Sequence, residues 1–240
     1  MSNDSLTTEA DVWPRLPLRG WDLVLIVLLA FAAVLLLDAV LADVTLSTPL
    51  LVATLVLQSL LMLGAVCAVA VGLRGATAKQ LGLRPSSRRW YIRAVEVALL
   101  TLPLVWLINA AVQWLSNEPF RNPQIDVIAP AGFSWFTAIG MTVVTGIVAP
   151  IAEEIAFRGV LYGWLRQRFG VTIGVIASAL LFSLAHGIPA LIPALAVQGV
   201  ILALVYEKSR SLWPAMITHG TYNTATVILL YAALGSGMSA

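Results

Sequence analysis

Long apolar runs recur along the whole chain, and they constrain its fold more than any other feature. A helix that spans a membrane needs about 20 predominantly apolar residues, because the hydrocarbon core of a bilayer is about 30 Å thick. Seven such runs can be read from the sequence, at about residues 21–42, 50–73, 91–115, 133–169, 171–186, 190–206 and 213–234. Each run is expected to be helical, since only a helix satisfies its own backbone inside lipid. The runs predict an all-α, polytopic membrane bundle of about seven transmembrane helices.

Composition excludes the other broad classes of protein. Of the 240 residues, 60% are hydrophobic and only 11% are charged, whereas soluble domains carry about 25% charged residues. That surplus of apolar side chains argues against an ordinary soluble domain and against disorder. The net charge of +2 predicts no nucleic-acid partner, because binding to a polyanion depends on many cationic contacts. The lipid bilayer is the partner that the composition predicts.

The positions of lysine and arginine predict how the bundle is oriented. With seven spans and a cytoplasmic N-terminus, 13 of the 14 Lys and Arg residues lie on the cytoplasmic side, and only Arg121 lies outside. Cytoplasmic loops of membrane proteins carry such an excess of positive charge. We therefore expect a multi-pass protein of the cell membrane, of bacterial type, with its N-terminus inside.

Two adjacent carboxylates lie within the fourth apolar run, where ionisable side chains are costly. Glu154 precedes Arg158 by four residues, the favourable order for an ion pair on one helix. Glu153 has no such local partner, so it is the candidate general base. The alternative is that both glutamates are structural and are tied to Arg158 and other donors.

The chain has only two histidines, and both lie on late apolar runs. His186 follows Phe182 by four residues, and Asn223 follows His219 by four, so each pair shares one helix face. If the chain turns at Gly170, Glu153 lies 17 residues before the turn and His186 lies 16 after it. Equal rise per residue then places them at the same depth. Since a straight helix over residues 133–169 would be about 55 Å long, a break near Pro150 or a protruding end is expected.

A carboxylate, two imidazoles and an amide in one pocket suggest hydrolysis. Glu153 would take a proton from water, one histidine would assist it, and the other would stabilise the oxyanion together with Asn223. No cofactor is favoured. Zinc is possible, since His186, His219 and either Glu153 or Glu154 could hold it with one open position.

Three motifs in fixed order resemble those of the CAAX-processing and bacteriocin-processing membrane endopeptidases (CPBP family). The resemblance covers about residues 133–234 and rests on Glu153-Glu154-x-x-x-Arg158, Phe182-x-x-x-His186 and His219-x-x-x-Asn223. It implies that Glu153 activates water with help from His186, and that His219 and Asn223 stabilise the oxyanion. It implies supporting roles for Glu154, Arg158 and Phe182, and a glutamate mechanism in preference to a metalloprotease mechanism.

The resemblance also divides the chain into four parts. Residues 1–20 are expected to form a cytoplasmic N-terminal tail and residues 21–132 three supporting transmembrane helices with their loops. Residues 133–235 would be the catalytic core, and residues 236–240 a C-terminal tail.

The expected activity is an intramembrane endopeptidase whose site opens to the cytoplasm and whose substrates are peptides or membrane proteins, prenylated or not. Two alternatives stay open. One is a non-catalytic immunity or scaffold protein of the same family, and the other is a proton-coupled transporter that uses the histidines as a relay. The sequence does not indicate an oligomeric state.

Overall fold

The computed structural model describes residues 13–45, 47–116, 123–129 and 134–236, and these residues fold into helices without a strand. The order is α1 (Gly20–Leu41), α2 (Thr48–Val66), η2 (Cys67–Leu73), α3 (Arg88–Ser116), α4 (Pro123–Ile128), α5 (Trp135–Val143), η3 (Val144–Val148), α6 (Ala149–Glu153), η4 (Glu154–Tyr162), α7 (Gly163–Ala185), η5 (Pro189–Leu191), α8 (Ile192–Ser209) and α9 (Leu212–Gly235). Segments η2, η3 and η4 are π-helical, and η5 is a 3₁₀ turn.

Helices in the described residues are long and apolar enough to cross a membrane in five places: Gly20–Leu41, Thr48–Leu73, Arg88–Ser116, Trp135–Ala185 and Pro189–Ser209. The predicted class, a helical membrane bundle, is therefore confirmed. The count of seven stays a prediction. The stretch Trp135–Ala185 counts once although its chain reverses at Gly170, and α9 is not among the five.

The chain turns at Gly170, where the sequence predicts a turn. Of the two alternatives expected for the long fourth run, a break near Pro150 or a protruding end, the break is not observed. Gly170 has φ 81° and ψ 177°, a backbone conformation that glycine adopts without strain. Near Pro150 the chain does not break. It stays helical, and its hydrogen bonding changes from α to π on both sides of α6. π-helical bulges widen a helix locally and often occur at functional sites. The stretch around Pro150 is therefore a candidate functional region.

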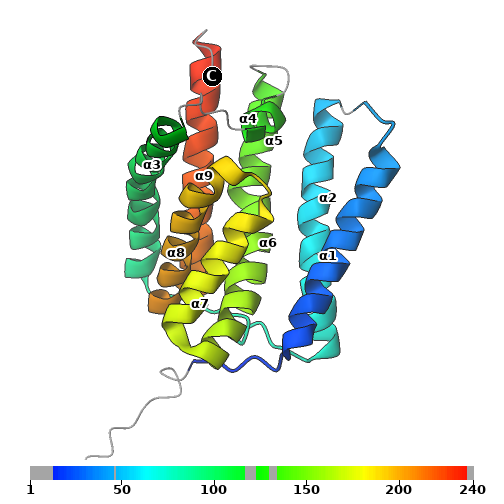
Figure 1. Ribbon diagram of the computed structural model, residues 1–240, viewed down its shortest axis with the longest axis vertical. Helices are drawn as coiled ribbons and strands as arrows, with labels where there is room; N and C mark the ends of the chain where they lie inside the picture. The colour runs from blue at the N-terminus through cyan, green and yellow to red at the C-terminus, as the bar shows by residue number, and fades with distance from the viewer. Residues whose placement is uncertain (1–12, 46, 117–122, 130–133, 237–240) are drawn as a thin grey trace, which may run out of the picture.

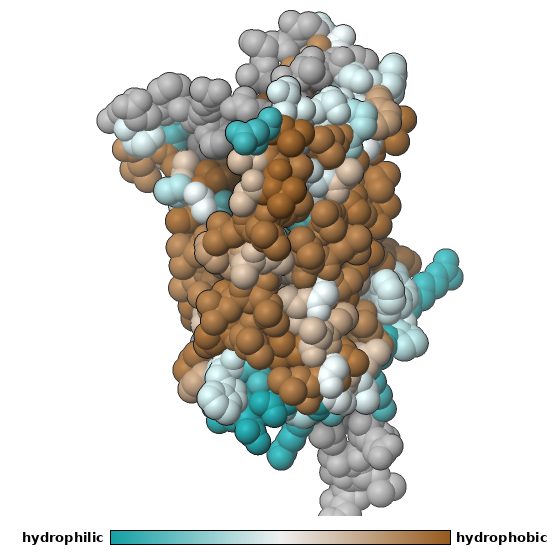
Figure 2. Space-filling model, turned by 90° about the vertical axis from the view of Figure 1, so that its right-hand side faces the viewer, coloured by the Kyte–Doolittle hydropathy of each residue, from teal (hydrophilic) through white to brown (hydrophobic). Residues whose placement is uncertain are grey.

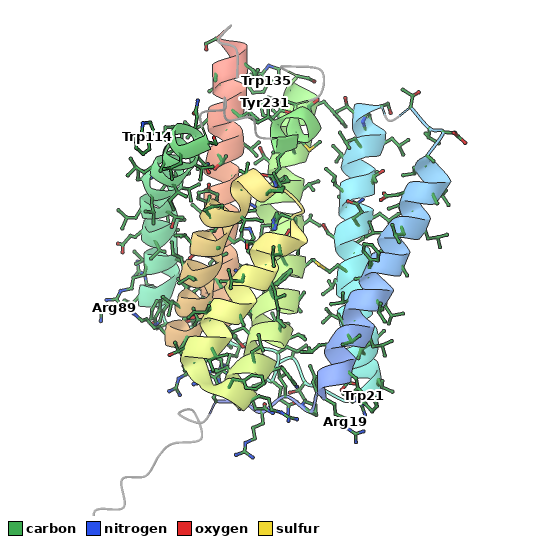
Figure 3. All side chains as sticks on the ribbon, viewed as in Figure 1. Arg19, Trp21, Arg89, Trp114, Trp135 and Tyr231 are labelled. Atoms are coloured by element: carbon green, nitrogen blue, oxygen red, sulfur yellow. The ribbon has the colours of Figure 1, made fainter. Side chains whose placement is uncertain are left out.

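The helices run side by side along the long axis of the molecule (Figure 1). Helix α8 packs on α7, α9 and α3, and α3 packs on α9, whereas α1 packs mainly on α2. A broad apolar belt lies between two more hydrophilic ends (Figure 2). Arg19 and Arg89 lie toward one end, here called the basic end, and Trp114, Trp135 and Tyr231 lie toward the other, the aromatic end (Figure 3). These features are those of a multi-pass membrane protein.

The segment before α1 packs across the basic end. The ring of Trp13 meets the rings of Tyr162 and Tyr206 edge-on, at centroid distances of 6.4 and 5.2 Å. The guanidinium of Arg166 lies over the Trp13 ring at 4.1 Å. The backbone N–H of Leu16 donates to the side chain of Gln167 at 2.9 Å. Residues 13–19 are therefore anchored to the bundle, while residues 1–12 and 237–240 of the predicted tails, and Arg121, lie outside the described residues.

Two helices meet so closely beside the polar motifs that only glycine fits. A Cβ atom added to Gly220 of α9 would lie 2.2 Å from the carbonyl oxygen of Gly146 in η3. A Cβ added to Gly146 would lie 2.1 Å from the hydroxyl of Thr224. The two glycines thus set the spacing between η3 and α9, the element that carries His219 and Asn223.

Candidate active site

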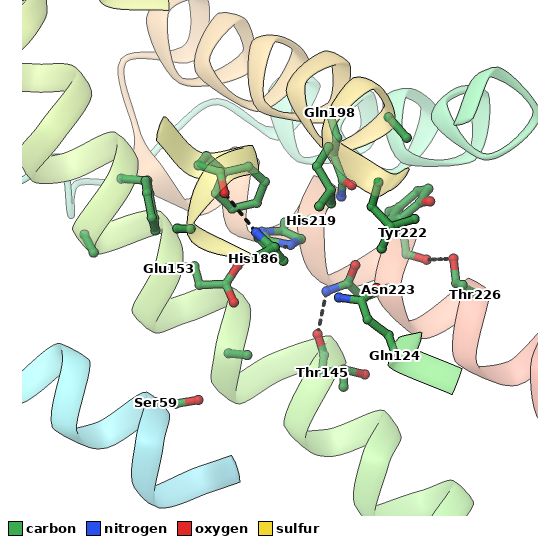
Figure 4. Close-up of a pocket in the computed structure, with 18 of the residues that line it drawn as sticks. Ser59, Gln124, Thr145, Glu153, His186, Gln198, His219, Tyr222, Asn223 and Thr226 are labelled. Atoms are coloured by element: carbon green, nitrogen blue, oxygen red, sulfur yellow. Dashed lines mark hydrogen bonds and ion pairs between the residues drawn. The ribbon is translucent and has the colours of Figure 1, made fainter. Parts of the chain in front are cut away.

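The centre of the bundle encloses a cavity of about 1110 Å³. Helices α1, α2, α3, α4, α6, α8 and α9 contribute to its lining, as do η4 and the end of α7. All four residues predicted to be catalytic line it: Glu153, His186, His219 and Asn223 (Figure 4). Residues that are 70 positions apart in the sequence are thus brought to one place.

The two adjacent glutamates have different surroundings. They stand at the junction of α6 and η4, and their side chains point in different directions. The Glu154 side chain is fully buried, and its Oε1 accepts from Nη1 of Arg158 at 2.9 Å, as the spacing of four predicts. The Glu153 side chain is 23% exposed and lines the cavity. One carboxylate is therefore held in the protein interior, and the other is available to a bound molecule.

His219 links the two glutamates. Its Nδ1 lies 2.9 Å from Oε1 of Glu154, and its Nε2 lies 3.7 Å from Oε2 of Glu153. An ionised carboxylate only accepts hydrogen bonds, so Nδ1 carries a proton and Nε2 is directed toward Glu153. Such a carboxylate partner fixes both the tautomer and the orientation of an imidazole.

His186 is the C-cap residue of α7, and a backbone carbonyl holds its ring. Its Nδ1 donates to the backbone carbonyl of Phe182 at 2.8 Å. Because a carbonyl oxygen cannot donate, the neutral ring keeps its lone pair on Nε2. The ring of Phe182 meets those of His186 and His219 edge-on, at 4.8 and 5.8 Å, and Arg158 lies over its face at 4.3 Å. The aromatic ring thus packs between the buried cation and both histidines.

Asn223 is positioned by a residue that the motifs do not include. Its Nδ2 donates to the backbone carbonyl of Thr145 in η3 at 2.9 Å. The amide nitrogen has two N–H groups, so one is held by the protein and the other is left for a ligand. No sequence pattern marks Thr145, because it takes part through its carbonyl group, which every residue has.

Gln198 is a cavity residue that the three motifs do not include. Glutamines within membrane helices often bond to a neighbouring helix. Instead, Gln198 lines the cavity with only 4% of its surface exposed, and no hydrogen bond is found for its side chain among the described residues. Figure 4 shows its amide among the other cavity residues, near His219. Tyr222 and Gln124 line the same cavity and were also not predicted as site residues.

The donor atoms do not form a ready metal site. Within the described part of the chain, no three His, Cys, Asp or Glu side chains gather as metal ligands. Both ring nitrogens of His219 are directed at carboxylates, and Nδ1 of His186 is bound to a carbonyl. Zinc binding by His186, His219 and Glu153 or Glu154 stays a prediction from the sequence, and no step proposed below passes through zinc.

Comparison with known proteins points to one family. The family model described as "Type II CAAX prenyl endopeptidase Rce1-like" matches residues 134–225, which include every residue named above for the three motifs. A protein of Bacillus subtilis (strain 168), named "Putative membrane peptidase YdiL", is 26% identical over 158 residues, which are 65% of this chain and 61% of the relative. The match thus spans about three fifths of the relative's length. No solved structure matches. The resemblance predicted from the three motifs is confirmed.

Proposed function

Starting from a chain whose residues 134–225 carry the Rce1-like region of the type II CAAX prenyl endopeptidases, we propose that it is an intramembrane endopeptidase in which Glu153 activates water. One observation carries the proposal. Glu153 presents a partly exposed carboxylate to the cavity, and Nε2 of His219, itself held by Glu154, lies 3.7 Å away. A general base with an oriented imidazole at its side is what hydrolysis of a peptide bond requires.

The remaining groups support the two halves of the reaction. Glu153 removes a proton from water, and the resulting hydroxide attacks the carbonyl carbon of the scissile peptide bond. Nε2 of His186 is the second basic atom that can orient this water. The free N–H of Asn223 donates to the oxyanion, and a His219 ring that is protonated on both nitrogens before the attack donates from Nε2 and keeps its proton throughout. When the C–N bond breaks, Glu153 returns its proton to the leaving amine, so water is the only reagent consumed.

The test removes the charge of the Glu153 side chain. Glu153→Gln keeps the size of the side chain but removes its basicity, and we expect it to reduce kcat at least about 100-fold, as general bases contribute 10²–10⁴-fold. The measurement is cleavage of a quenched fluorescent peptide library by detergent-purified protein, with and without a chelator. Activity that survives the chelator and is lost in Glu153→Gln is the expected outcome.

Two results would contradict the proposal. Equal cleavage by wild type and Glu153→Gln would remove Glu153 from the chemistry, and loss of wild-type activity with chelator would favour the metalloprotease mechanism. If the wild type folds and cleaves nothing, and Glu153→Gln lowers its melting temperature, the polar cluster serves stability. That result would favour the non-catalytic immunity or scaffold protein.

A further inference from the structure

The cavity is lined by more carboxamide side chains than the catalytic motifs contain. The chain has eleven Asn and Gln residues. Six of them line this one cavity, and they come from α2, α3, α4, α8 and α9: Gln58, Asn109, Gln113, Gln124, Gln198 and Asn223. Only Asn223 belongs to a motif. A membrane bundle does not need amides for packing, so their concentration in one cavity points to a ligand.

Two of these amides have polar atoms without a protein partner. Gln198 lines the cavity with only 4% of its surface exposed, and no hydrogen bond of its side chain is found in the described residues. Oδ1 of Asn109 is buried and lacks a hydrogen-bond partner there too. Leaving a polar group without a partner in an apolar interior costs about 1–3 kcal/mol. A bound molecule with donors and acceptors of its own would recover that cost.

Two of the amides, Gln113 and Gln124, lie toward the aromatic end. Gln113 precedes Trp114 of the aromatic end, and Gln124 lies on α4, which is located at the same end (Figures 1 and 3). In the other direction, toward the turn at Gly170, the lining residues of η4 are apolar, Val160 and Leu161. The polar lining therefore extends from Glu153 toward the aromatic end.

The lining that α1 contributes is entirely apolar: Leu23, Ile26, Val27, Ala30, Phe31 and Val34. Helix α2 contributes Leu55 and Met62 together with the polar Gln58 and Ser59. The cavity thus combines six carboxamides, here called the carboxamide wall, with the apolar face of α1. An extended peptide has the matching surface, because backbone N–H and C=O groups project sideways while side chains alternate between its two faces.

We propose that the carboxamide wall, led by Gln198 and Asn109, binds the backbone of an extended peptide segment and delivers its scissile bond to Glu153. This inference rests on the proposed function and deepens it. A carboxamide both donates and accepts, so it can pair with an N–H and a C=O of the same strand. In lipid an extended strand has no water to satisfy these groups, so the amides replace that water. Side chains that face α1 enter the apolar half of the cavity.

The placement also sets the direction of entry. The excess of Lys and Arg assigns the basic end to the cytoplasm, so the amide-lined part of the cavity faces the other side of the membrane. The substrate segment enters from the aromatic end, whereas the sequence predicted a site open to the cytoplasm.

The experiment measures binding apart from turnover. The probe is a fluorescein-labelled 12-residue peptide of alternating Leu and Ala, and the protein carries Glu153→Gln in nanodiscs so that no cleavage occurs. We expect Gln198→Leu and Asn109→Leu each to raise Kd about 5- to 10-fold, the loss of about one net hydrogen bond. Gln80→Leu is the matched control, because Gln80 bonds to the backbone of Arg15 and does not line the cavity.

A set of N-methylated peptides separates backbone recognition from a structural effect. Each peptide lacks one backbone N–H, and we expect one of them to bind the parent protein about as weakly as the unmodified peptide binds the Gln198→Leu variant. That peptide should show no further loss with Gln198→Leu, since the two changes remove the same hydrogen bond. A variant that had only lost its fold would weaken every peptide equally.

The outcomes distinguish the two proposals. The proposed peptide-binding role of the carboxamide wall is overturned by either of two results. One is an equal Kd for the parent, Gln198→Leu and Asn109→Leu, and the other is no binding of the peptide. If wild type cleaves peptides, and Gln198→Leu and Asn109→Leu made in the wild-type protein leave KM unchanged, the peptidase stands and this inference falls. If the peptide binds with the expected pattern and wild type does not cleave it, the binding site stands and the proposed hydrolysis falls.

Discussion

At the scale of single residues, the structure assigns two neighbouring glutamates to different tasks. Glu154 has no exposed side-chain surface and bonds to both Arg158 and His219, whereas Glu153 faces the cavity. Glu154 therefore positions His219 and neutralises a buried guanidinium without touching a substrate. The same chemical group thus contributes to stability at one position and, as we propose, to catalysis at the next.

This difference predicts opposite effects on folding for one substitution at two positions. Glu154→Gln leaves the charge of Arg158 buried without its counter-ion, and we expect it to lower the free energy of unfolding by about 3 kcal/mol. Glu153→Gln, the matched control, should change stability little because its carboxylate is partly exposed in the cavity. Denaturant unfolding in detergent, followed by circular dichroism at 222 nm, measures both. Equal stability of the two variants would contradict the assignment of Glu154.

Local spacing predicts some of these contacts and not others. The pair Glu154–Arg158 follows from a separation of four residues on one helix. The bond between His219 and Glu154 joins residues 65 apart, and the ion pair between Asp22 and Arg74 joins residues 52 apart. A single sequence shows which residues share a helix face, but it does not show which helices are neighbours. For that reason the motifs could be predicted to meet, whereas their hydrogen bonds could not.

At the scale of elements, the contact between η3 and α9 controls the geometry of the site. Gly146 and Gly220 allow the two backbones to touch, and the hydrogen bond from Asn223 to Thr145 lies beside them. A side chain at this contact would force the helices apart and would move Asn223 with them. The site is therefore sensitive to residues that line no part of the cavity.

We expect Gly220→Ala to destabilise the protein by about 1–3 kcal/mol, the usual cost of overpacking, and to lower kcat through displaced Asn223. Gly64→Ala is the matched control, since a Cβ there would meet nothing within 4 Å. Replacing a glycine inside a helix where space is open should raise stability by about 0.5–1 kcal/mol. Thermal unfolding together with peptide cleavage tests both. A Gly220→Ala variant as stable and active as wild type would show that the contact relaxes freely.

Helix positions were predictable, but helix type was not. The apolar runs mark the long helices to within a few residues, and glycine at position 170 marks the turn. The π-helical segments η3 and η4 have no signature in hydropathy, because one wider turn barely changes the apolar pattern. They nevertheless determine where Thr145 and Glu154 point.

At the scale of the whole molecule, two chemically different ends define an axis through the membrane. Arg19 and Arg89 lie toward one end, and exposed Trp114 and Trp135 lie toward the other (Figure 3). The sequence predicts this orientation from its charges alone. It does not predict the cavity, whose lining combines all the long helices, and this is why the role of Gln198 and Asn109 emerged only from the fold.

The orientation is tested by labelling single cysteines in intact cells. Cys67 is the only cysteine, so Cys67→Ser gives a background without thiols. We expect Gln113→Cys, near the aromatic end, to react with a membrane-impermeant maleimide in intact spheroplasts. Lys79→Cys, exposed in the connector at the basic end, should react only after lysis. The reverse pattern would place the basic end outside and would invert the proposed direction of entry.

The reversal at Gly170 has one more consequence, which concerns the length of the chain. Glu153 and His186 are 17 and 16 residues from that turn, on two helices that pack together. One residue inserted into either arm would shift its half of the site by about 1.5 Å and rotate it by about 100°. The length of this hairpin is therefore constrained by the site, because an insertion or deletion in either arm would misalign Glu153 and His186. Chain length should vary instead in the connector between α1 and α2, which holds no residue of the site.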